Sequence, residues 1–171
     1  MTLLKLLEGG DRRRIGRADE VVAMLSRDPG RFRELVAGLW SEDPVVRMRA
    51  ADATEKFTRG NGEFLKPYKT ELLGLMAETR QQEVRWHLAA IIPRLSLSAR
   101  ERQLAVSLLK VYLEDRSSIV KTCALQGLAD LAQDDSHLRT QAIELLRESA
   151  RTGTAAMKAR SRKLLLHLES R

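Results

Sequence analysis

The sequence predicts an all-α fold, a right-handed α-solenoid of about ten helices arranged as antiparallel pairs. The main observation is a doubled period of apolar residues. One series is spaced by 38, 36 and 37 residues, and its members are Val46, Val84, Val120 and Met157. A second series is spaced by 37, 36 and 37 residues, and its members are Leu35, Leu72, Leu108 and Leu145. Two series that share one period indicate stacked helical repeats with two helices in each repeat.

The composition agrees with this fold class. Hydrophobic residues make up 43% of the chain and charged residues 31%, whereas aromatic residues make up only 4%. The 10 glycines and 4 prolines are few for a β-sandwich, in which turn formers and aromatic side chains are frequent. We therefore expect one repeat domain over residues 1–171, with atypical N-terminal helices in 1–28 and four helix pairs in 29–168.

The N-terminal quarter contains the less regular elements. Residues 3–8 predict a short helix that ends at Gly9-Gly10, and residues 15–25 predict a second helix with its apolar side inward. Asp28-Pro29 then starts a helix over residues 29–39, because proline suits the first helical position.

The helix over residues 44–59 carries the clearest pattern. Asp43 can accept hydrogen bonds from the free N–H groups at its start, and Pro44 occupies the first turn. Residues 60–62 (Gly-Asn-Gly) end it.

The remaining helices follow from the same signals. Pro93 is expected to distort the end of its helix, and Ser98 with Glu101 forms a capping-box pattern. The predicted helices cover residues 64–76, 82–95, 98–113, 117–132, 134–150 and 154–168.

The run Asp-Pro-x-Val-Arg-x-x-Ala-Ala-x-Ala at residues 43–53 resembles the second helix of a HEAT repeat, and residues 84–89 and 120–125 look like further copies. The resemblance implies a superhelix whose second helices line the concave face. It also implies that one basic residue of each copy pairs with acidic groups of an adjacent repeat; these are Arg47, Arg85 and Lys121.

Helical geometry yields candidate binding residues on that face. At 100° per residue, the position two residues after each apolar anchor points to solvent, and Met48 and Trp86 occupy it. Exposed Trp and Met are typical interface anchors. An alternative is that Trp86 covers its own helix or fills a gap beside a neighbouring repeat. We expect a protein or peptide to contact Met48, Arg49, Trp86, His87 and Arg94.

The net charge of +7 is unevenly distributed. Residues 11–17 carry +3 and residues 147–171 carry +5, whereas residues 18–146 carry −1. Basic ends attract phosphates or acidic partners, although ordinary solubility charge explains them equally well. The alternative function is therefore nucleic-acid binding through Arg12, Arg13, Arg14, Arg160, Arg162 and Lys163.

Catalytic and metal sites are not expected. His87, His137 and His167 are far apart, and none forms the His-Glu pairs of HEAT-like di-iron hydroxylases, so neither a metal nor another cofactor is predicted. Cys123 has no histidine at a useful helical spacing. A non-catalytic scaffold for a protein or peptide is the preferred interpretation.

Alkylpurine DNA glycosylases resemble the chain in their HEAT-like fold and basic charge. Their active site needs a Trp with an Asp on the same concave wall. Asp43 follows Trp40 but is better explained as a helix cap, and Trp86 has no Asp within one helical turn. Asp52 in the preceding repeat is the nearest candidate, so the glycosylase residues do not carry over.

The cysteine content and the hydrophobic pattern bear on cellular location. Cys123 is the single cysteine, so no disulfide forms within the chain, which favours a reducing cytoplasm. Residues 1–8 are too short and too charged for a signal peptide, and no apolar run approaches the roughly 20 residues that span a bilayer. We expect a cytoplasmic protein with no membrane contact.

Overall fold

The computed structural model describes residues 2–11 and 14–170, and within these ranges it contains ten α-helices and no β-strand. The all-α prediction is confirmed, as is the expected helix number. The first helices of the five pairs are α1 (Leu3–Leu7), α3 (Phe32–Ala37), α5 (Lys69–Glu78), α7 (Ala99–Tyr112) and α9 (Ser136–Thr152). The second helices are α2 (Ala18–Arg27), α4 (Pro44–Phe57), α6 (Gln82–Ile91), α8 (Ser118–Leu131) and α10 (Ala155–Glu169).

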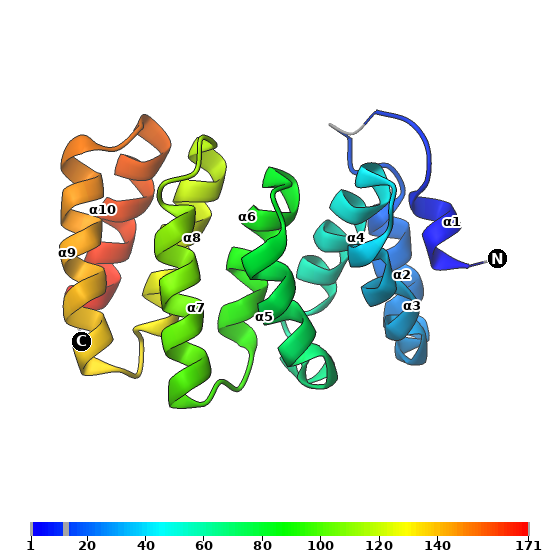
Figure 1. The fold of residues 1–171 in the computed structure, drawn as a ribbon, viewed down its shortest axis with the longest axis horizontal. Helices are drawn as coiled ribbons and strands as arrows, with labels where there is room; N and C mark the ends of the chain where they lie inside the picture. Colours follow the sequence, from blue (N-terminus) through cyan, green and yellow to red (C-terminus); the bar gives the residue numbers. More distant parts are fainter. Residues whose placement is uncertain (1, 12–13, 171) are drawn as a thin grey trace.

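The second helices form a continuous row. Helix α2 packs on α4, α4 on α6, α6 on α8, and α8 on α10, while α3, α5, α7 and α9 each pack on the second helix of their own pair. Figure 1 shows the pairs following one another from the blue N-terminal end to the red C-terminal end. Helix α2 thus continues the row, although the sequence of residues 1–28 fits the repeat pattern poorly.

Local signals in the sequence set the helix starts. The Asp43 Oδ1 atom accepts the Val45 N–H at 2.8 Å, as expected for an N-cap. Ser98 and Glu101 form the predicted capping box, in which each side chain accepts the backbone N–H of the other residue. Side-chain caps also begin the last three helices, at Ser117, Asp135 and Thr154.

Several predicted helices are α-helical over only part of their length. Pro67 lies in a 3₁₀ segment, Gly62–Tyr68, that leads into α5, because proline has no N–H for the α-helical ladder. Pro93 has the expected effect, since α6 gives way to the 3₁₀ segment Ile92–Arg94. Two further 3₁₀ segments flank α3, at Pro29–Arg31 and Gly38–Trp40.

The core runs between the two layers of helices. The anchors Val46, Val84, Val120 and Met157 are all buried. Helices α6 and α8 approach closely at Gly127, where an added Cβ would lie 2.6 Å from the Ala89 carbonyl oxygen. No helix among the described residues is long and apolar enough to cross a membrane.

Candidate functional site

The predicted exposed patch is wrong for two of its residues. Met48 is 5% exposed and Arg49 is 3% exposed, so neither offers a surface to a partner. The angular count fails because α4 has neighbours on several sides: α2, α6, α1 and α3 all pack on it, and ten of its 14 residues are buried. A position that points away from its own pair is therefore still covered.

Arg49 instead stabilises the chain segment that precedes α2. Its guanidinium donates to the backbone carbonyls of Leu7, Glu8, Gly9, Asp11 and Arg14 at 2.6–3.3 Å. This role could not be predicted from the residue pattern, because every segment of a chain contains backbone carbonyl acceptors.

Trp86 and His87 lie on α6 but do not form an open patch. Trp86 is partly buried and packs against the core, and its ring centroid is 5.8 Å from that of His87. The His87 Nε2 atom lies 3.9 Å from Asp52 Oδ1. Burial lowers the pKa of His87, while the nearby Asp52 carboxylate opposes that shift.

A groove crosses four consecutive second helices and is the main candidate site. Its volume is about 580 Å³. Arg94 of the predicted peptide contacts lines it, as does Arg160 of the predicted nucleic-acid contacts. We call it the second-helix groove. Its lining residues are Glu55, Arg59, Ala90, Pro93, Arg94, Gln126, Asp130, Gln133, Asp134 and Arg160.

At the α4 end of this groove, the charged side chains form ion pairs with one another. Glu55 pairs with Arg59 at 2.7 Å and also with Arg94. Arg94 donates in addition to the Glu55 carbonyl at 2.5 Å and to Thr58 Oγ1 at 2.9 Å. Burial of Glu55 opposes ionisation, but the two guanidinium groups outweigh it and lower the pKa of that carboxyl. Glu55 and Arg94 therefore satisfy one another.

In the middle of the groove, one polar side chain lacks a full set of hydrogen-bond partners. Gln126 bridges two helices, since its Oε1 accepts from Arg160 Nη1 at 2.7 Å and its Nε2 donates to Asp130 Oδ1 at 2.8 Å. The second carboxylate oxygen of Asp130 has no hydrogen bond or ion pair within residues 2–11 and 14–170. Burial raises the pKa of Asp130, against the opposing effects of Arg94, Arg160 and His167.

The charges of the groove balance. Its acidic members are Glu55, Asp130 and Asp134, and its basic members are Arg59, Arg94 and Arg160. The surface is therefore neutral overall but rich in hydrogen-bond donors and acceptors.

The basic candidates do not gather in one place. Arg12 and Arg13 lie outside the described residues. The Arg14 residue is exposed near the first helices, whereas Arg160, Arg162 and Lys163 are exposed on α10. Figure 1 places these two regions at opposite ends of the row of helices.

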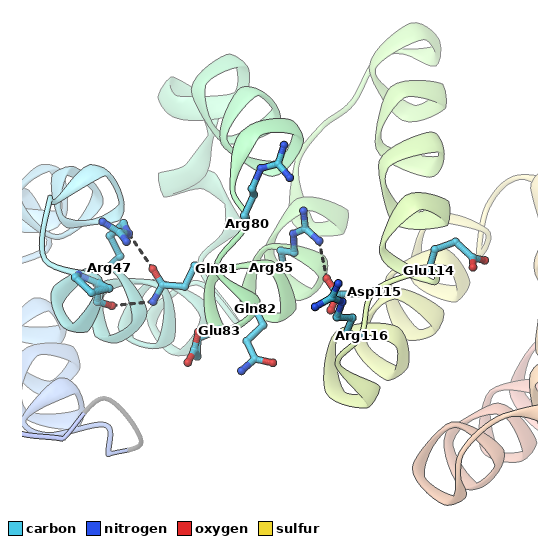
Figure 2. A pocket seen from close by; sticks show the side chains of 10 residues that line it. Arg47, Arg80, Gln81, Gln82, Glu83, Arg85, Glu114, Asp115 and Arg116 are labelled. Atoms are coloured by element: carbon cyan, nitrogen blue, oxygen red, sulfur yellow. Dashed lines mark hydrogen bonds and ion pairs between the residues drawn. The ribbon is translucent and has the colours of Figure 1, made fainter.

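A second, larger cavity of about 710 Å³ lies where the second helices begin (Figure 2). Its side chains link neighbouring repeats. Arg85 forms an ion pair with Asp115 at 2.5 Å, as the HEAT resemblance implied. Arg47 instead donates to the amide oxygen of Gln81 at 2.8 Å, so the expected acidic partner is wrong there. Lys121 forms no ion pair with any residue that the structure describes. We regard this cavity as structural because Arg85 and Asp115, and likewise Arg47 and Gln81, bind one another across it.

The residues considered for catalysis in the sequence have the following surroundings in the structure. Burial raises the pKa of Cys123, so its thiolate is disfavoured. Trp40 is 45% exposed, and Asp43 serves as the cap of α4. Among residues 2–11 and 14–170, no three His, Cys, Asp or Glu side chains gather closely enough to hold a metal.

Comparison with known proteins supports the fold and gives no function. No protein-family model matches the sequence, and no curated protein matches it significantly. Two crystal structures of engineered proteins, Northeast Structural Genomics Consortium targets OR329 and OR366, are similar. The first has a TM-score of 0.65 and 22% identity over 98% of this chain and 78% of its own. The second has a TM-score of 0.67 and 21% identity over 99% of this chain and 80% of its own. At these identities the likeness concerns the fold alone.

The sequence analysis missed the centre of the groove. Gln126 and Asp130 lie six and ten residues after the anchor Val120, and Arg94 lies ten residues after Val84. These positions share one helical face across repeats, so aligning the repeats by their anchors would have revealed them. The apolar residues expected to be exposed pointed instead to Met48, which the structure buries.

Proposed function

We propose that the protein is a non-catalytic, HEAT-like right-handed solenoid that binds an extended peptide segment of another protein in the second-helix groove. The doubled period, the row of packed second helices and the groove across four of them support this proposal. We further propose that the groove belongs to the concave face, as in the HEAT repeats that the sequence resembles. The reducing cytoplasm favoured by the lone Cys123 is the proposed location.

The observation that carries the proposal is a neutral groove with anchored polar groups. An extended peptide presents N–H donors and C=O acceptors along its length and has no net backbone charge. Packed helix axes are about 8–10 Å apart, so four second helices span roughly 25–30 Å. That distance corresponds to about eight residues of extended chain.

Nucleic-acid binding is the second candidate, and a different observation favours it. Arg160, Arg162 and Lys163 are all exposed on α10. Duplex DNA carries one negative charge per about 1.7 Å, so binding it needs several unpaired cations along a continuous surface. The balanced groove lacks that excess, and the basic residues of α10 cover only one end of the molecule.

Selection from a displayed library of random twelve-residue peptides tests the proposal. We expect enriched peptides to bind the wild-type protein and to lose affinity for the Gln126→Ala variant by about tenfold. Gln126 should matter because it orients both Arg160 and Asp130. Arg162→Ala is the matched control, since this exposed α10 residue lies outside the groove, and it should leave affinity within about twofold.

Salt dependence separates the two candidates. Peptide affinity should change weakly between 50 and about 300 mM salt, whereas phosphate contacts release counterions and lose affinity steeply. Failure to enrich any peptide, together with salt-sensitive binding of duplex DNA that Arg162→Ala weakens, would favour the nucleic-acid candidate instead.

A further inference from the structure

One carboxylate in the second-helix groove is left without a full set of partners. Asp130 is half-buried on α8, and its Oδ1 atom accepts the Gln126 amide at 2.8 Å. Its other oxygen has no hydrogen bond or ion pair with any residue the structure describes. Solvent still reaches that oxygen, but partial burial makes the charge of the carboxylate more costly than at an open surface.

The cations near Asp130 are held away from it. Arg94 is bound by Glu55 and Thr58, and the Nη1 atom of Arg160 donates to Gln126. Neither forms an ion pair with Asp130, and nor does His167, although all three favour its ionised form. The same Gln126 side chain binds both Arg160 and Asp130, which links the two residues without an ion pair between them.

The site therefore favours a donor supplied from outside. The groove volume of about 580 Å³ admits a long side chain, and Asp130 lies among its lining residues. Charge-assisted hydrogen bonds to a carboxylate are about twice as strong as neutral ones, and partial burial reduces their screening by water. A Lys or Arg side chain supplies such a donor at the end of a long apolar stem.

We propose that Asp130 receives a Lys or Arg side chain of the peptide that occupies the second-helix groove. This inference rests on the proposed function and adds the chemistry of one specificity position. The free donors of Arg160, whose Nη1 alone is engaged, then face the carbonyl groups of the same peptide.

A double-mutant cycle tests the inference with a peptide enriched from the displayed library. The protein variant is Asp130→Asn, which keeps an oxygen for Gln126 but removes the charge. The peptide variant replaces its single most enriched basic residue with Gln. We expect each change to weaken binding by about tenfold and the pair to weaken it little further, because both remove the same contact.

Glu144→Gln is the control, because Glu144 is an exposed carboxylate on α9 that lies outside the groove. It should change affinity by less than about twofold. Circular dichroism and thermal unfolding of Asp130→Asn establish that the variant is folded.

The possible outcomes separate this inference from the function on which it rests. Enriched peptides without a shared Lys or Arg, or additive effects in the cycle, would overturn the Asp130 assignment and leave the peptide-binding function standing. A library that yields no peptide dependent on Gln126 would overturn both. The expected result is coupling between Asp130 and the basic residue of the peptide, with no coupling between that residue and Glu144.

Discussion

At the scale of single residues, Arg49 shows how a side chain that resembles a surface contact becomes structural. Its guanidinium is buried and donates to five backbone carbonyls between Leu7 and Arg14. Gly16 permits this arrangement. Its φ of +56° suits glycine, and an added Cβ would lie 2.7 Å from the Arg49 Cζ atom. The N-terminal segment is therefore shaped around one arginine.

Replacing Arg49 by Ala should destabilise the protein by about 2–4 kcal/mol, because several buried carbonyl groups lose a charged donor. The first readout is the free energy of unfolding in urea. The second is limited proteolysis, which should cut between Leu7 and Ala18 faster than in the wild-type protein.

The control for that change is Arg162→Ala, which removes an exposed arginine with no interaction partner among the described residues. It should alter stability by less than about 0.5 kcal/mol. Equal effects of the two substitutions would show that Arg49 does not organise the segment.

Removing the charge of Asp130 should stabilise the protein, whereas removing Arg49 should destabilise it. Burial raises its pKa above the value in the unfolded chain, so folding disfavours the ionised form. The resulting cost is fully present above the folded-state pKa and disappears as the pH falls below the unfolded-state pKa. Asp130→Asn should therefore raise Tm at pH 7 by about 1–2 °C and have little effect near pH 3.

Thermal unfolding at the two pH values measures this difference directly. A lower Tm for Asp130→Asn at pH 7 would mean that the carboxylate is stabilised by its surroundings. The docking site proposed above would then lose its physical basis, since binding sites commonly reduce the stability of the free protein.

At the scale of elements, the second helices depend on close approach of their backbones. Gly127 of α8 lies against Ala89 of α6, and no side chain larger than hydrogen fits between them. Gly74 on α5 offers a contrast, because nothing lies within 4 Å of a Cβ added there. Both glycines lie within α-helices, but Gly127 is tightly packed against a neighbouring helix and Gly74 faces open space.

The substitutions Gly127→Ala and Gly74→Ala should therefore act in opposite directions. Gly74→Ala should stabilise the protein by about 0.5–1 kcal/mol, the usual gain of Ala over Gly in a helix. Gly127→Ala should destabilise it by about 1–3 kcal/mol, since the added methyl group forces α6 and α8 apart. Urea unfolding of both variants checks the pair, and a stabilised Gly127→Ala would contradict the close packing.

At the scale of the whole molecule, the sequence allows most of the fold to be predicted. The period of about 37 residues, the cap at Asp43 and the capping box at Ser98 are local or repeating signals, so they survive without knowledge of the tertiary structure. The α-helical continuity near Pro67 was less predictable, because whether a chain continues as α or 3₁₀ helix depends on small differences in the last turn.

The candidate site was less predictable than the fold. The helical angle describes the exposure of one isolated helix, whereas Met48 and Arg49 are covered by other elements. The groove depends on which helices become neighbours, and its central side chains, Gln126 and Asp130, resemble ordinary surface residues in the sequence. Only the row of second helices brings them beside Arg94 and Arg160.

The central claim is that a peptide occupies the second-helix groove, and NMR chemical-shift mapping tests it most directly. A peptide selected as described above is titrated into isotopically labelled protein. The account predicts the largest shifts at the side-chain amide of Gln126 and the Nε–H groups of Arg94 and Arg160, with small changes in α5, α7 and α9. Shifts confined to the first helices, or to Arg162 and Lys163 on α10, would contradict it.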